Sequence, residues 1–197
     1  MKILIKKATI HQHGQEDSSK KDILIENGVI TSIAKSITDG KATIIESKDL
    51  HVSPGWMDIG AQPGQPGYEY RETFQSLSQC ARAGGYTALA TFPRNQPPIQ
   101  SRVEIEYLQQ LVASLPLHIF PIGAISQNLE GKDLTEMIDM FHAGAIGFSD
   151  GRKNSNEAGL LTRAMEYVMP LGTTIIHFPL DRSLVAEGQM HEGKISA

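Results

Sequence analysis

From Pro54 onward, short apolar runs alternate with segments of helical periodicity, and this alternation restricts the fold more than any other feature of the sequence. Tyr86–Phe92 reads YTALATF, which is typical of a buried strand. Arg102–Ser114 follows, with apolar residues recurring on one helical face. Ser101 is a suitable N-cap for that helix, and Gly84-Gly85 is a suitable end for the helix before it. Repeated β-loop-α units predict a parallel sheet with crossover helices.

The same patterns predict each element of this region. Strands are expected at Trp56–Ile59, Tyr86–Phe92, Leu117–Gly123, Ala145–Phe148 and Thr173–His177. Helices are expected at Glu72–Ala83, Arg102–Ser114, Lys132–His142 and Glu157–Met169. A complete TIM barrel has eight such units, so residues 54–197 are predicted to form the first half of a (β/α)8 barrel, incomplete within this chain. A doubly wound open sheet is the rival α/β architecture, but no glycine-rich phosphate-binding fingerprint follows the first strand.

Residues 1–53 follow a different pattern, without helical periodicity. The Asn27-Gly28 pair is typical of a tight hairpin between two strands. We therefore predict a small β unit, part of a β-sandwich, with strands at Lys2–Ile10, Asp22–Ile25, Val29–Ala34, Ala42–Ile45 and Leu50–Val52. His11 and His13 could together chelate zinc, but a hairpin tip offers no third or fourth ligand. Two solvated loop histidines are expected instead.

The charge balance excludes some classes of partner. With 18 Lys and Arg against 22 Asp and Glu, the formal net charge is −4, which argues against a nucleic-acid surface or a polybasic membrane anchor. No apolar run approaches the ~20 residues that cross a bilayer, and the N-terminus has no apolar segment typical of a signal peptide. Cys80 is the only cysteine, so an intramolecular disulfide is excluded, and its mid-helix position predicts a buried side chain. We expect a cytoplasmic protein.

Several short motifs follow one another along the chain. They are Val52–Asp58 (VSPGWMD), Pro66-Gly67 with Arg71-Glu72-Thr73, Ala83–Thr87 (AGGYT), Arg94–Pro98 (RNQPP), Gly144–Gly151 (GAIGFSDG) and Gly188–Gly193 (GQMHEG). In this order they resemble the N-terminal half of a dihydroorotase of the type found in multifunctional pyrimidine complexes, within the amidohydrolase superfamily. The resemblance implies a barrel of the metal-dependent hydrolase type. It also implies the family reaction, the reversible hydrolysis of dihydroorotate to N-carbamoyl-aspartate at a zinc site.

The resemblance assigns roles to three residues. Asp150 matches the family's metal-binding and catalytic Asp, and His177 matches a zinc-binding His at the end of the fifth barrel strand. Asn95 matches a residue that hydrogen-bonds the substrate. Each position also has a structural interpretation: a loop cap for Asp150, a hydrogen-bonded histidine at the edge of the core for His177, and a turn residue for Asn95.

The first strand of the barrel departs from the family pattern. Relatives carry Asp-x-His-x-His, whose two histidines bind zinc, whereas Asp58–Gln62 reads DIGAQ, with Gly60 and Gln62 at the histidine positions. A glutamine amide is a poor zinc ligand beside imidazole. Gly64 stands where the family has an Arg for the substrate carboxylate, a charge-assisted contact worth roughly 1.5–3 kcal/mol. Arg71 lies nearby but occupies the family's Lys position. Zinc is therefore expected to be absent or weakly bound.

Three functions remain open from the sequence. The favoured one is a degenerate, catalytically impaired homologue with a structural or regulatory role. Its partners would be an aspartate transcarbamoylase, an active dihydroorotase or further copies of this chain. A weaker hypothesis keeps a metal-free pocket for a small molecule, with Asn95 as its anchor.

The main alternative is an active dihydroorotase or cyclic amidohydrolase with a rebuilt one-metal site. That site would use Asp150 and His177, which both resemble family ligands, together with ligands outside this chain. A catalytic zinc usually has three protein ligands, so a further ligand near Gln62 would be needed. Gln65 and Glu69 are the polar candidates there.

Overall fold

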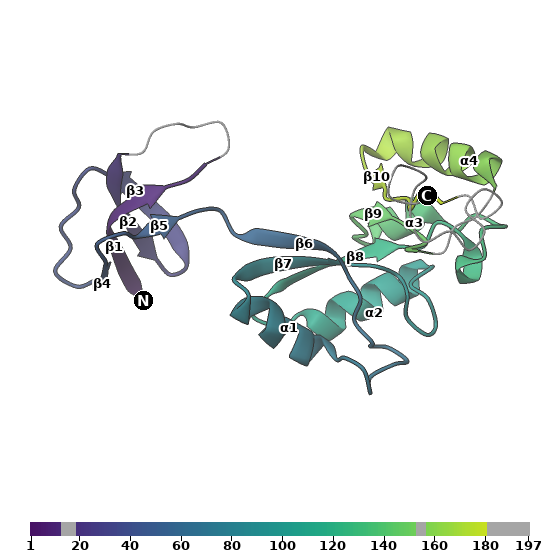
Figure 1. Cartoon of the computed structure of the whole chain (residues 1–197), viewed down its shortest axis with the longest axis horizontal. Coiled ribbons are helices and arrows are strands. Elements are labelled where there is room, and N and C mark those ends of the chain that lie inside the picture. Colours follow the sequence, from purple (N-terminus) through teal and green to yellow (C-terminus); the bar gives the residue numbers. More distant parts are fainter. Residues whose placement is uncertain (13–18, 153–156, 181–197) are drawn as a thin grey trace, which may run out of the picture. The chain divides into compact units, whose positions relative to one another are not determined.

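The computed structural model describes residues 1–12, 19–152 and 157–180, and the chain divides into two compact units, Met1–Gly55 and Trp56–Ala197 (Figure 1). The first unit is a sheet of five strands: β1 (Lys2–Ile10), β2 (Lys20–Glu26), β3 (Val29–Ala34), β4 (Thr43–Glu46) and β5 (His51–Val52). The strand order is β3-β2-β1-β4, and β5 also pairs with β1. His13 and the motif at 188–193 lie outside the described residues.

The first sheet confirms the predicted small β unit, whose described residues form a single sheet. β2 and β3 form the expected antiparallel hairpin, and both Asn27 (φ 51°) and Gly28 (φ 83°) have the positive φ of its tight turn. Leu4, Ala8 and Ile23 are its buried apolar side chains. His11 is exposed, as expected, but its Nε2 also lies 2.7 Å from Nδ1 of His51, a contact that the sequence did not predict.

One buried carboxylate ties this sheet together. Asp22 accepts hydrogen bonds from the backbone N–H groups of Lys7 and Ile37, both at 2.9 Å, and lies 3.2 Å from Nζ of Lys6. Burial alone would raise the pKa of the Asp22 carboxyl, but these hydrogen bonds outweigh it and hold that pKa below its usual value. The ionised Asp22 therefore joins β1, β2 and the segment that leads to β4.

The second unit is a parallel sheet whose strand order follows the chain, β6-β7-β8-β9-β10. Its strands are β6 (Trp56–Ala61), β7 (Tyr86–Thr91), β8 (His118–Gly123), β9 (Gly147–Phe148) and β10 (Thr174–Ile175). Its helices are α1 (Phe74–Ala83), α2 (Arg102–Val112), α3 (Met137–His142) and α4 (Ala158–Val168), with short 3-10 turns at η1 (Gln127–Leu129) and η2 (Met169–Leu171). α1 contacts β7, α2 contacts β8 and α4 contacts β10 (Figure 1).

This sheet is the curled half-barrel that the β-loop-α pattern predicts. A doubly wound sheet reverses its strand order at a switch point, and the described strands show no reversal. The core lies between the sheet and its helices and includes Phe74, Leu89, Ile105, Leu108, Met137, Met140, Phe148 and Leu160. None of the helices in the described residues is both long and apolar enough to cross a membrane.

The predicted helix ends depend on local chemistry and are confirmed at two helices. The Ser101 hydroxyl accepts the N–H of Val103 at the start of α2. Thr73 and Ser76 form a capping box at the start of α1, and Gly84 ends that helix. Because Thr73 is the N-cap, α1 begins at Phe74 rather than at the expected Glu72.

The expected helix Lys132–His142 is wrong in its first half. The backbone N–H of Gln127 donates to the Asp133 carbonyl, and the Thr135 hydroxyl donates to Ala124 at 2.7 Å. These bonds hold residues 131–136 against the segment after β8, so α3 begins only at Met137.

Three further expectations need correction. β9 and β10 contain two residues each, shorter than the expected Ala145–Phe148 and Thr173–His177. α4 is one residue shorter at each end than the expected Glu157–Met169. Cys80 is exposed rather than buried, because Phe74, Ser78 and Ala81 form the buried side of α1.

Candidate functional site

The segments that follow β6, β7, β8 and β9 are joined by backbone hydrogen bonds. The N–H of Gln96 donates to the Pro66 carbonyl at 3.0 Å, and that of Ala124 donates to Ile99 at 2.8 Å. The N–H of Ser149 donates to the Gly123 carbonyl at 2.9 Å. All these segments leave the carboxyl ends of parallel strands, the edge at which TIM-barrel sites form. The structure therefore has one continuous candidate surface.

At Gly60 the strand itself excludes an ordinary side chain. Gly60 lies where the pairing of β6 with β7 shifts register, and its φ of +104° is a conformation that L residues rarely adopt. A Cβ there would lie 2.8 Å from the Phe92 ring. A histidine at this position would therefore need a different backbone path, in addition to a moved ring.

At Gly64 the chain folds back on its own backbone. A Cβ on Gly64 would meet the Tyr68 carbonyl and would lie 2.7 Å from the Glu72 carbonyl. The N–H of Tyr68 also donates to the Gly64 carbonyl at 2.6 Å, which closes the turn. Gly67 has a φ of +97°, and a Cβ on it would likewise meet the backbone of Gln96. No arginine side chain fits at position 64 while this turn is closed.

The side chains of the two polar candidates for a replacement metal ligand already accept backbone hydrogen bonds at this turn. Gln65 Oε1 accepts the N–H of Phe74 at 3.2 Å, and Glu69 Oε1 accepts the N–H of Gly67 at 3.0 Å. The Gly67 N–H also lowers the pKa of the Glu69 carboxyl. Both oxygens stabilise the loop that carries them.

Asp150, which follows β9, uses both carboxylate oxygens within the protein. It is only 8% exposed. Oδ1 accepts the N–H groups of Ile125 at 2.9 Å and of Ser126 at 3.0 Å, and Oδ2 accepts the Ser126 hydroxyl at 2.6 Å. This geometry corresponds to the loop-cap interpretation of the sequence, because the carboxylate fastens the segment after β8 to the segment after β9.

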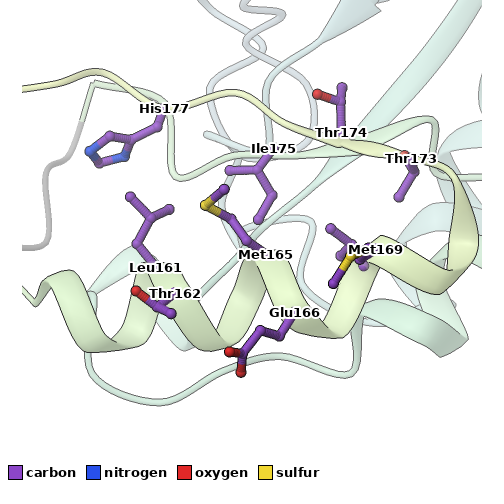
Figure 2. Close-up of a pocket in the computed structure, with 10 residues that line it drawn as sticks. Leu161, Thr162, Met165, Glu166, Met169, Thr173, Thr174, Ile175 and His177 are labelled. Atoms are coloured by element: carbon purple, nitrogen blue, oxygen red, sulfur yellow. The ribbon is translucent and has the colours of Figure 1, made fainter.

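His177, which follows β10, lies on the side of its segment that faces α4. It is exposed and lines a groove of about 630 Å³ together with Leu161 and Met165 of α4 and Ile175 of β10 (Figure 2). Residues two apart in an extended segment share a face, so Ile175 and His177 project to the same side. The Asp150 carboxylate is instead engaged with Ser126, although β9 and β10 are neighbours.

The described residues do not by themselves bring together the donor set of a catalytic zinc. Such a zinc usually has three protein ligands and an open position. Among the described residues, no three His, Cys, Asp or Glu side chains gather closely enough to hold a metal. Both carboxylate oxygens of Asp150 already accept hydrogen bonds from the segment after β8, and His177 lies beside α4.

Asn95, which follows β7, links two loops and is nearly inaccessible, at 4% exposed. Its Nδ2 donates to the Gln65 carbonyl at 2.5 Å, which corresponds to the turn-residue interpretation. Its Oδ1 is buried and accepts no hydrogen bond from any described residue. Asn95 also lines a polar cavity of about 340 Å³ at the candidate surface, together with Gln62, Tyr68, Arg71, Arg94, Gln96, Pro98, Asn128 and Leu129.

The sequence reasoning missed Arg94. Its aliphatic stem packs over Gly151, where a Cβ would lie 2.9 Å from Cδ, and the residue lines the 340 Å³ cavity. Arg71 lines the same cavity, with its guanidinium 4.9 Å from the Tyr68 ring centre and 5.3 Å from that of Tyr70. The sequence did carry one signal for a role of Arg94 at this surface, because a charged residue stands shortly after the end of a buried parallel strand.

Comparison with known proteins gives one consistent family. A sequence model of the dihydro-orotase-like family matches residues 51–197. The dihydroorotase of Syntrophus aciditrophicus is 37% identical over 199 residues, which cover 100% of this chain and 47% of the relative. That of Pelotomaculum thermopropionicum is 33% identical over 196 residues, with 100% and 46% covered. The chain thus spans about half the length of the curated relatives it matches.

Solved structures show the same fold at low sequence identity. An L-hydantoinase (dihydropyrimidinase) from Arthrobacter aurescens has a TM-score of 0.77 and 19% identity, covering 94% of this chain and 42% of that one. A dihydroorotase crystal structure has a TM-score of 0.62 and 11% identity, covering 91% and 51%. These similarities support the half-barrel architecture.

The closed turn at Gly64 predicts a selective cost of adding one methyl group. Gly64→Ala should lower the free energy of unfolding by about 1–3 kcal/mol, because its Cβ meets backbone carbonyls. Gly159→Ala, at an exposed position of α4, is the matched control and should be neutral or stabilising by up to about 1 kcal/mol. Urea denaturation of both variants measures the difference. Equal stability of Gly64→Ala and the parent would show that the turn opens readily.

The two retained family residues should differ in their effect on stability. In EDTA, Asp150→Ala should lower the free energy of unfolding by about 2–4 kcal/mol, because it leaves the N–H groups of Ile125 and Ser126 unpaired. His177→Ala should change it by less than about 0.5 kcal/mol, since the side chain is exposed. Urea denaturation with and without zinc checks both. Zinc stabilisation of the parent that both variants abolish would instead identify a metal pair.

Proposed function

The chain belongs to the dihydroorotase-like family, and we propose that it is a catalytically impaired member with a structural or regulatory role. The observation that carries this proposal is the backbone path at Gly60 and Gly64. At both positions the family chemistry needs a long side chain. At Gly60 a positive φ and the Phe92 ring oppose one, and at Gly64 backbone carbonyls leave no room for one.

The family reaction makes two demands that these positions would have to meet. A Lewis-acidic metal generates hydroxide near neutral pH and polarises the amide carbonyl, and zinc serves in members of this family. A paired hydrogen bond from an arginine holds the substrate carboxylate. Gly60, Gln62 and Gly64 supply neither the imidazole ligands nor that arginine. We therefore infer that zinc is absent or weakly bound.

The alternative is an active dihydroorotase with a rebuilt one-metal site, and the observed contacts weigh against it. Asp150 would have to release Ile125 and Ser126, both bound through hydrogen bonds of 3.0 Å or less. His177 would have to turn away from α4. Among residues 1–12, 19–152 and 157–180, no contact compensates for either rearrangement.

A role in assembly draws support from the edges of the first sheet. The outer strands β3 and β4 expose large apolar side chains, with Val29 63% and Ile44 58% exposed, and Ile30, Ile33 and Ile45 behave alike. Exposed apolar surface beside unpaired strand edges is typical of a surface that another element or protein covers. The proposed partners are an aspartate transcarbamoylase, an active dihydroorotase or further copies of this chain.

Dihydroorotate hydrolysis tests the proposal directly. The purified chain, supplied with zinc, should show no turnover above that of an identically prepared His177→Ala variant. The Syntrophus aciditrophicus dihydroorotase serves as the positive control. Zinc-dependent turnover that His177→Ala removes would contradict the proposal and indicate a rebuilt metal site.

A chimera controls for the length of the chain, which spans 47% of that relative. In it, this chain replaces the matching segment of the Syntrophus protein, so that the relative supplies the remainder. A folded chimera without turnover, with folding checked by circular dichroism and thermal melting, agrees with the proposal. A chimera that hydrolyses dihydroorotate would contradict it.

A further inference from the structure

Two histidine rings of the first unit face each other across a pair of adjacent strands. Nε2 of His11, which directly follows β1, lies 2.7 Å from Nδ1 of His51, the first residue of β5. The ring centres are 5.0 Å apart and the ring planes differ by 20°. These values place the two nitrogens between the rings, each directed at the other. In such a pair one nitrogen donates a hydrogen bond and the other accepts it.

The backbone holds both rings on one face of the sheet. β5 runs parallel to β1, with Thr9 opposite His51. Residues two apart in a strand share a face, so His11 lies on the same face as Thr9 and His51. The N–H of Thr9 donates to the Leu50 carbonyl and that of His11 donates to the Val52 carbonyl, both at 2.8 Å. The pairing of β1 with β5 therefore brings the two rings together.

The facing nitrogens lie close to the geometry of a metal site. Imidazole is the commonest metal ligand among side chains. Zn–N bonds are about 2.0–2.1 Å long, so two nitrogens on one tetrahedral zinc lie about 3.3 Å apart. His11 and His51 are both exposed, so a small turn of each ring reaches that separation and an ion can enter from water. The ring that donates in the metal-free pair then takes its other tautomer, through exchange with water.

We propose that His11 Nε2 and His51 Nδ1 together bind one divalent ion of the class that imidazole suits, such as Zn²⁺, Cu²⁺ or Ni²⁺. Water supplies the other coordination positions, because no group of three His, Cys, Asp or Glu side chains that could hold a metal exists in the described part of the chain. The ion joins the end of β1 to β5. The site lies within the first unit and is independent of the proposed function, which concerns the barrel residues.

Calorimetric titration of the EDTA-treated and dialysed chain tests the ion class. We expect one Zn²⁺ per chain, bound more weakly than at sites with three or four protein ligands. Cu²⁺ should bind more tightly than Zn²⁺, and Mg²⁺, which prefers oxygen ligands, should not bind. No Zn²⁺ binding at millimolar concentration would overturn the proposal. Equal binding of Mg²⁺ would overturn the assignment to imidazole ligands.

Variants of single histidines test the residues. His11→Gln and His51→Gln should each weaken Zn²⁺ binding about tenfold or more. His142→Gln, at an exposed histidine of α3, is the matched control and should bind like the parent. Unchanged binding by both variants of the pair, with thermal melting showing that they fold, would overturn the assignment. Binding that His13→Gln removes and His51→Gln retains would equally overturn it, in favour of His11 with His13.

Nitrogen NMR of the imidazole rings tests the atoms. Zn²⁺ should shift the resonances of His11 Nε2 and His51 Nδ1, and coordination through the other nitrogen of either ring would contradict the geometry. The same titration of Asp150→Ala and His177→Ala distinguishes this site from a metal site in the barrel. Zn²⁺ that both variants retain supports the proposal, and Zn²⁺ that either variant loses would overturn it. Turnover assays on the same samples test the proposed catalytic impairment separately.

Discussion

The contact of backbone with backbone at Gly64 and Gly67 is the constraint on which the rest of the candidate surface depends. It closes the turn after β6 and brings Pro66 to Gln96 of the next loop. The closed turn positions Tyr68 and Arg71 at the cavity. The same closure leaves no space for an arginine at position 64. One packing arrangement therefore shapes both the turn after β6 and the surface beside it.

Asp150 shows how a residue that resembles a ligand becomes a structural element. Its carboxylate satisfies two backbone N–H groups and the Ser126 hydroxyl, all in the buried segment after β8. Pairing a buried carboxylate in this way offsets the cost of removing its charge from water. A metal ion bound to Asp150 would have to compete with these hydrogen bonds.

Local chemistry explains which parts of the fold could be predicted. The Asn27-Gly28 turn, the Ser101 cap and the β-loop-α alternation each depend on neighbouring residues, and the structure confirms them. The segment before Met137 could not be predicted, because hydrogen bonds with the segment after β8 override its helical pattern. The directions of the Asp150 and His177 side chains, like the place of Arg94, depend equally on tertiary contacts.

A crystal structure of the chain grown with zinc, with anomalous scattering recorded at the zinc edge, tests the central claim most directly. The account predicts no zinc at the segments after β6 to β10, with Asp150 still bound to Ile125 and Ser126. A zinc ion coordinated by Asp150 and His177, together with a third protein ligand, would contradict it.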